Sequence, residues 1–194
     1  MIDFDPDTHT YTLGGRRLPS VTQVLDPLGS YAGIPLDVLE RKADIGDAVH
    51  LASEMYDRGE LDIGSVPKEI AGYFAGWVKF REESKFRIDH IEARVWAKKH
   101  GFAGTADRLG SFGKHLAVFD IKCTAVLMPT VSLQLAAYQL AATHSLSYAA
   151  KERFAVLLKP SGEYSLHEFK DPTDVSVFIS ALQLFIWSSR HAKP

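Results

Sequence analysis

Cysteine is nearly missing from this sequence, since Cys123 is the only one among 194 residues. A disulfide within the chain and a four-cysteine zinc or iron–sulfur site are therefore both excluded. No apolar run approaches the roughly 20 residues that cross a bilayer, and residues 1–5 are acidic instead of basic and apolar. From these absences we expect no secretory signal, no membrane segment and a cytoplasmic location.

A surplus of basic residues is missing as well. The formal net charge is -2 and the sequence pI is about 6.4, whereas a nucleic-acid binder usually shows a basic face. A nucleic-acid binder is not excluded, because an acidic metal site would hide part of the basic charge in the sum. Two local basic clusters are typical of solvated faces. They comprise Arg81, Lys85 and Arg87, and Arg94, Lys98 and Lys99.

The length and pattern favour one domain over residues 1–194, with a hairpin and short helix in 1–30 and a core in 36–190. Residues 1–18 alternate as a small β-meander with a Gly14-Gly15 turn. Ser20 with Gln23 three residues on is a capping box, which predicts a short helix.

Helices and strands alternate over the rest of the chain. We predict helices over residues 35–60, 66–84, 129–143 and 172–189, and strands over 87–96, 102–109, 116–122, 154–158 and 164–169. The second and third of these strands would be joined by a turn containing Gly110 and Gly113, and the last two would pair around residues 160–162. This order predicts an α/β core sheet flanked by helices, with an N-terminal β-hairpin.

Two carboxylates and a lysine stand on two neighbouring predicted strands. Gly104 and Asp107 share the first strand, and Asp120 and Lys122 are two residues apart at the end of the second. Side chains alternate faces along a strand, so Asp120 and Lys122 should point the same way with Ile121 turned into the core. An antiparallel neighbour would bring Asp107 beside Asp120. Such a group would bind a hard divalent ion next to a fixed positive charge, which suits phosphodiester hydrolysis.

A helical stripe and a second helical pair complete the pattern. Gly46, His50 and Glu54 are each four residues apart, and so are Gln134 and Tyr138. A glycine inside a helix costs about 1 kcal/mol relative to alanine, so we expect a close approach at Gly46. Each of these residues alone has an ordinary interpretation: a hydrogen-bonded structural histidine, or a solvent-facing glutamate.

Taken in order, these residues resemble a known family. Gly46 and His50 on a helix, Glu92 on a strand, Gly104 and Asp107 on the next, Asp120 and Lys122 on the third, and Gln134 and Tyr138 on the following helix match the PD-(D/E)XK nuclease superfamily, RecB-type. Residues 18–22 are similar to a segment of phage-encoded and mitochondrial genome-maintenance exonucleases of this group. The resemblance implies a restriction-endonuclease-like core with a central mixed sheet. The compactness of the chain and the expected absence of a targeting peptide fit a bacterial or phage-encoded protein.

The resemblance also implies roles for single residues. Asp107 and Asp120 would hold Mg²⁺ or Mn²⁺ with the Ile121 carbonyl, and His50 would be an additional ligand. Lys122 would position the attacking water or stabilise the transition state. Glu92 would serve a second metal, orient the ligand groups, or pair with a base.

Contacts with nucleic acid would involve four residues: Gln134, Tyr138, Thr124 and Arg108. Gln134 and Tyr138 have an alternative role, which is to orient Lys122. The sequence departs from the family at Cys123, where RecB-type members often have threonine, and Thr124 comes next.

The resulting hypothesis is a metal-dependent DNase, an exonuclease on single-stranded or resected DNA ends. A structure-selective endonuclease and a catalytically silent nucleic-acid-binding module are the alternatives, and RNA is a third substrate option. No helicase motif accompanies the pattern, so unwinding would need a separate helicase or recombination partner.

Overall fold

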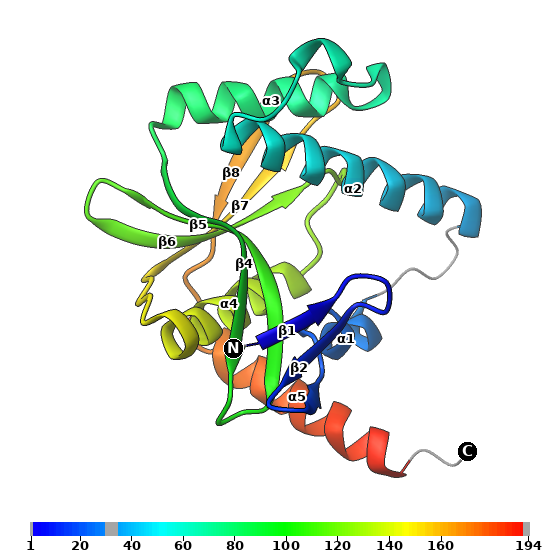
Figure 1. The fold of residues 1–194 in the computed structure, drawn as a ribbon, viewed down its shortest axis with the longest axis vertical. Coiled ribbons are helices and arrows are strands. Elements are labelled where there is room, and N and C mark those ends of the chain that lie inside the picture. Colours follow the sequence, from blue (N-terminus) through cyan, green and yellow to red (C-terminus); the bar gives the residue numbers. More distant parts are fainter. Residues whose placement is uncertain (1, 30–34, 192–194) are drawn as a thin grey trace.

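A small antiparallel sheet opens the chain. The computed structural model describes residues 2–29 and 35–191 (Figure 1), so the ends of the predicted 1–30 and 1–194 segments lie outside the described residues. The sheet contains β1 (Ile2–Asp5), β2 (Thr10–Leu13) and β3 (Arg16–Leu18), in that spatial order. The predicted hairpin is therefore confirmed and extended by a third strand.

The predicted capping box is present at the start of α1 (Val21–Leu25). The Ser20 hydroxyl accepts a hydrogen bond from the Gln23 amide N–H, and the Gln23 side chain accepts one from the Ser20 amide N–H. A single turn, η1 (Asp26–Leu28), follows. The segment before α1 also docks on the main sheet, because the Ala103 amide N–H donates to the Pro19 carbonyl at 3.1 Å.

The main sheet has five strands in the order β4-β5-β6-β7-β8. Their bounds are β4 (Arg87–Ala97), β5 (Phe102–Phe112), β6 (His115–Lys122), β7 (Glu152–Leu158) and β8 (Tyr164–Glu168). Neighbouring strands are antiparallel except β6 and β7, which are parallel and joined through α4 (Thr130–Leu146). The predicted mixed sheet is confirmed.

Helices cover both faces of this sheet (Figure 1). On one face lie α2 (Leu36–Arg58), the turn η2 (Ile63–Ser65) and α3 (Lys68–Ser84), packed on β6 and β7 through Trp77, Phe80 and Phe119. On the other lie α1, α4 and α5 (Asp174–His191), packed through Leu135 and Phe178. No helix among the described residues is both long enough and apolar enough to cross a bilayer.

Two predictions about glycine are wrong. Gly110 lies inside β5 instead of in the turn, where an added Cβ would overlap the Phe86 ring and the Arg87 carbonyl. Gly46 was expected to be closely approached, yet a Cβ there would meet nothing within 4 Å among the described residues. The close approach occurs on α3 instead, where a Cβ on Gly72 would overlap the carbonyl of Pro160 in the β7–β8 turn.

Candidate metal and active site

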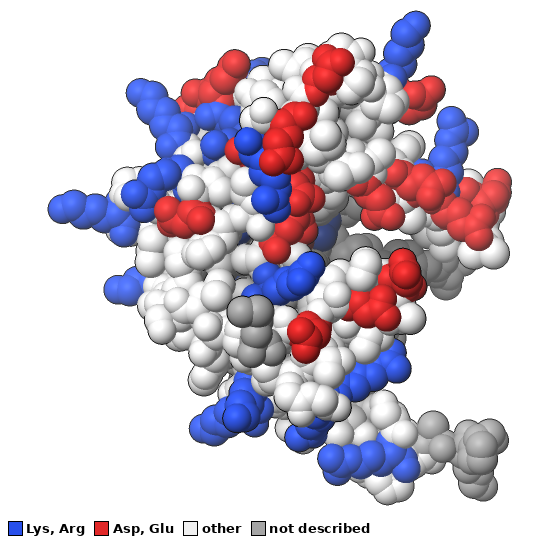
Figure 2. All heavy atoms as spheres, viewed as in Figure 1, with Lys and Arg blue, Asp and Glu red and all other residues white. Residues whose placement is uncertain are grey.

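A cavity of about 440 Å³ collects most of the residues that the sequence analysis selected. It lies between α2, α4, the N-terminal sheet and strands β4 to β6. Figure 2 shows a hollow between α2 and the N-terminal sheet, with acidic side chains along α2. The predicted residues that line the cavity are His50, Glu54, Glu92, Gly104, Asp107, Asp120, Lys122, Gln134 and Tyr138.

Asp107 is held at the point where β5 and β6 lie side by side. Arg108 pairs with Phe119 in the sheet register, which places Asp107 next to Asp120. The Asp107 carboxylate accepts a hydrogen bond from the Ile121 amide N–H at 2.6 Å, and its Oδ2 lies 3.6 Å from Nδ1 of His50. The antiparallel pairing of β5 and β6 therefore brings Asp107 beside Asp120, as predicted.

His50 reaches the same point from α2. Its Nε2 lies 3.0 Å from the Ile121 carbonyl oxygen. A carbonyl oxygen only accepts, so Nε2–H donates to it here. A cation bound at this point would replace that proton and could take both atoms as ligands. One ligand atom each from His50, Glu92 and Asp107 lies within 4.8 Å of the other two.

Asp120 is fully buried, and its Oδ1 has no hydrogen-bond partner among the described residues. Its other oxygen, Oδ2, lies 2.6 Å from Nζ of Lys122. Burial raises the pKa of Asp120 to about 6, against the opposing charge of Lys122. A buried carboxylate oxygen without a donor costs free energy unless a cation compensates it. Together with the oxygen and imidazole ligands nearby, this fits a hard divalent ion.

Glu92 adopts an uncommon backbone conformation, with φ of 48° in the middle of β4. Ile91 pairs with Arg108 and Ala93 pairs with Ala106, so Glu92 lies opposite Asp107 on the neighbouring strand β5. Burial and the negative charge of Asp107 raise the pKa of Glu92 to about 8. Strained residues of this kind gather at functional sites.

Lys122 stays positively charged in this setting. Burial acts to lower the pKa of its ammonium, but the negative charges of Asp120 and Asp107 outweigh that effect and the pKa is raised. The site therefore holds a fixed cation against two carboxylates. Such a cation can stabilise negative charge on a bound anion.

The four residues assigned to nucleic-acid contacts have different surroundings. The assignment of Arg108 is wrong, because its side chain is fully buried and bound to Asp57 and Glu92. Thr124 is exposed but is not among the residues that line this cavity, and its hydroxyl donates to the Val126 carbonyl. Tyr138 is buried against Gly104 and accepts a hydrogen bond from the Gln134 amide at 3.2 Å.

The N-terminal sheet also contributes residues to the candidate site, which no sequence motif indicated. Tyr11 lines the cavity and its hydroxyl lies 2.8 Å from the Thr105 hydroxyl, and His9 lines it as well. Neither residue belongs to a motif, and only the alternation of β2 would have marked Tyr11 as inward-facing.

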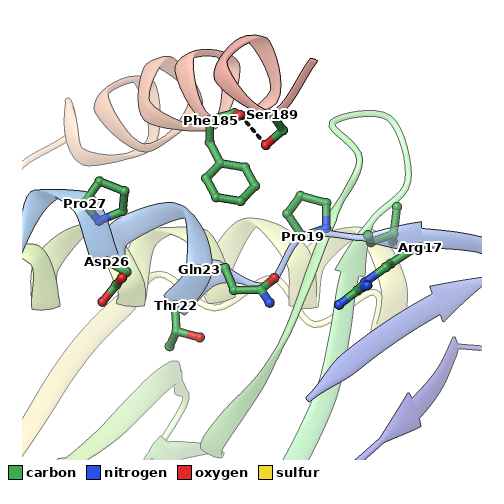
Figure 3. A pocket seen from close by; sticks show the side chains of 9 residues that line it. Arg17, Pro19, Thr22, Gln23, Asp26, Pro27, Phe185 and Ser189 are labelled. Atoms are coloured by element: carbon green, nitrogen blue, oxygen red, sulfur yellow. Dashed lines mark hydrogen bonds between the residues drawn. The ribbon is translucent and has the colours of Figure 1, made fainter. Parts of the chain in front are cut away.

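A larger cavity of about 800 Å³ lies on the far side of α1 from the carboxylates. In Figure 3 the Phe185 ring of α5 points into it, toward Pro19 and Gln23. Thr22 lines both cavities, so the first turn of α1 separates them. Of these two cavities, only the smaller one is lined by Asp107, Asp120 and Lys122, and it is therefore the candidate site.

Comparisons with known proteins bear on the fold. No known family profile and no curated protein sequence matches this chain. An alkaline exonuclease from Laribacter hongkongensis superposes with a TM-score of 0.51 at 12% identity, over 88% of this chain and 87% of that one. This chain shares the fold of that exonuclease. The predicted restriction-endonuclease-like core is thereby confirmed, while membership of the RecB-type group stays a prediction.

The crystal structure of SSO0001 gives a TM-score of 0.48 at 16% identity, over 89% of this chain and 76% of that one. The Laribacter comparison concerns the fold alone, and neither comparison shows an activity.

Proposed function

We propose that this protein is a divalent-metal-dependent DNA exonuclease of the RecB-type PD-(D/E)XK group. The observation that carries the proposal is the buried Asp120 with a partnerless oxygen, placed beside Lys122 in a cavity that also holds His50, Glu92 and Asp107. The nuclease fold supports it. Among structures of this kind, such a set suits hydrolysis of a phosphodiester better than binding alone.

The chain's own residues would divide the work. Asp107, Asp120, His50 and the Ile121 carbonyl would hold Mg²⁺ or Mn²⁺, with Glu92 beside them. A bound divalent ion supplies an activated water and polarises the phosphate. Lys122 would hold its ammonium against the phosphate oxygens, where negative charge grows in the transition state.

The residues behind Lys122 would keep it in place. Tyr138 is too deeply buried for a broad surface contact, so we assign it to orientation of the site through its hydrogen bond with Gln134. Gln134 and Thr124 are retained as contacts with the DNA backbone. Orientation of the site and one strand contact would then come from neighbouring turns of α4, and the other contact from the segment before this helix.

Several wider assignments belong to the same proposal. We propose one nuclease domain over residues 1–194, acting on single-stranded or resected ends in recombination, repair or phage DNA metabolism. The single cysteine supports an intracellular location, and we propose a cytoplasmic protein that is bacterial or phage-encoded. A separate helicase or recombination protein would provide unwinding.

Degradation of end-labelled linear single-stranded DNA tests the proposal, with covalently closed circles and an EDTA control beside it. We expect loss of the linear strand alone, and only when Mg²⁺ or Mn²⁺ is present. Cutting of circles would replace the exonuclease with an endonuclease. No cleavage of either form, with DNA binding that survives EDTA, would leave a silent binding module.

A further inference from the structure

A buried arginine lies directly behind the candidate metal site. Arg108 has no exposed surface, and it directly follows the candidate ligand Asp107 in the sequence. A buried charge of this kind is expensive unless its donors are all used and an opposite charge is close. Its partners therefore show what the arginine is for.

Four hydrogen bonds fix the guanidinium. Nε donates to Asp57 Oδ2 at 2.8 Å and Nη2 donates to the Ser53 hydroxyl at 3.1 Å, both on α2. Nη1 donates to the Glu92 carboxylate at 3.1 Å and to the Asp107 carbonyl at 2.6 Å, both at the candidate site. One planar group thus joins the helix behind the site to two of its candidate ligand residues.

The anchor on the α2 side is itself held in place. Asp57 is almost fully buried, and its second oxygen accepts a hydrogen bond from Arg81 of α3 at 3.0 Å. The Trp77 ring of α3 lies under the Arg108 guanidinium, with 5.4 Å from Cζ to the ring centroid. The arginine is therefore clamped by two helices before it reaches Glu92.

Glu92 needs such a clamp more than an ordinary strand residue does. Its φ of 48° is a conformation that costs energy for a residue with a Cβ. Its side chain is about a quarter exposed, at 26%, so burial alone does not immobilise it. Among the described residues, Arg108 is the only one that donates a side-chain hydrogen bond to its carboxylate.

We propose that Arg108 is a positioning residue of the metal site. Anchored by Asp57, it holds the Glu92 carboxylate and the Asp107 main chain at the separation that a divalent cation requires. This inference rests on the metal site of the proposed function, not on its nucleic acid. Groups that orient metal ligands from behind typically change metal affinity 10- to 100-fold when they are altered.

Calorimetric titration of the metal-free protein with Mn²⁺ tests this role without any cleavage assay. Arg108→Lys keeps the charge but cannot bridge Asp57 and Glu92 with one rigid fork. We expect Mn²⁺ affinity to fall at least about tenfold. Asp57→Asn weakens the anchor of Arg108 without changing a candidate ligand, and it should also lower Mn²⁺ affinity. This variant provides the test if the Arg108→Lys protein fails to fold.

Arg153→Lys is the matched control. Arg153 forms a similarly buried pair with Asp174 at 2.9 Å, on β7 and α5, and does not line the cavity. We expect it to lower the melting temperature as Arg108→Lys does, with unchanged Mn²⁺ affinity. A double-mutant cycle adds the second control: in a Glu92→Ala background, Arg108→Lys should cost less Mn²⁺ affinity than in the wild-type background, because the carboxylate it orients has gone and only its hydrogen bond to the Asp107 carbonyl remains.

The inference is overturned if the Arg108→Lys and Asp57→Asn proteins keep the wild-type Mn²⁺ affinity while their melting temperatures fall as that of the Arg153→Lys protein does. A loss that is undiminished in the Glu92→Ala background would also overturn it, since none of the effect would then pass through Glu92. If Mn²⁺ affinity depends on Arg108 as expected but the wild-type protein cleaves no DNA, the proposed nuclease is refuted and this role stands.

Discussion

Asp120 and Lys122 form one ion pair but have separate tasks in the proposed reaction. Asp120 offers the partnerless oxygen to the cation, whereas Lys122 meets charge on the phosphate. Asp120→Ala should therefore abolish cleavage and Mn²⁺ binding together, with an unchanged far-ultraviolet circular dichroism spectrum. Wild-type turnover in this variant would remove Asp120 from the mechanism.

Lys122→Ala should behave differently. We expect the single-turnover cleavage rate to fall about 10²- to 10³-fold, which is the usual effect of losing one group that stabilises a transition state. Mn²⁺ affinity, measured by calorimetry, should change much less. An equal loss of metal affinity would contradict the role given to the lysine.

The helices α2 and α3, which cover one face of the main sheet, differ in how closely their glycines are packed. Gly72 on α3 lies against the Pro160 carbonyl, and Gly46 on α2 has open space around it. Gly72→Ala should lower the free energy of unfolding by about 1–3 kcal/mol, as overpacking does. Gly46→Ala should raise it by up to about 1 kcal/mol, because alanine is the better helix former.

Urea unfolding of the two variants measures both changes in one experiment. Destabilisation of both would show that something packs on Gly46 after all. A stabilised Gly46→Ala protein with weaker DNA binding would instead place the substrate along this stretch of α2, which borders the candidate site at Asp47 and His50.

Across the whole molecule, the metal-free site should make stability depend on pH. The folded pKa values of Glu92 (about 8) and Asp120 (about 6) lie above the ordinary values near 4 that hold in the unfolded chain. The folded state therefore binds more protons at these two groups between those limits, so their contribution to stability is greatest below about pH 4 and is lost as the pH rises to about 8.

Thermal melts in EDTA from about pH 5 to about pH 8 should show this decline, and Glu92→Gln should flatten its upper part. Since protons compete with a cation for the same oxygens, added Mn²⁺ should raise the melting temperature more at about pH 8 than at about pH 5. A metal-free protein that gains stability over this range would contradict the raised pKa values.

Local patterns were enough to predict most of the fold. The Ser20 and Gln23 capping box, the alternation of the strands and the spacing of Asp107 and Asp120 all depend on near neighbours, and each is found in the structure. The conformation at Glu92 and the burial of Arg108 depend on distant partners. Asp57 is 51 residues from Arg108 in the chain, and no local pattern encodes that pair.

Gly110 illustrates the same limit. A glycine near a second glycine indicates a turn, but here it makes room for Phe86 at the start of β4. Only the packing of the neighbouring strand distinguishes the two uses. Site residues on adjacent strands are thus predictable from spacing, whereas the groups that hold them from behind are not.

The position of Trp77 gives the protein an optical reporter of its own. Trp77 is fully buried beneath Arg108, while Trp187 is 60% exposed on α5 and Trp96 is half-buried on β4. With Trp96 and Trp187 replaced by phenylalanine, the remaining fluorescence would come from the indole that touches the guanidinium. Its emission would then follow, in real time, any movement of the arginine as cations enter or leave.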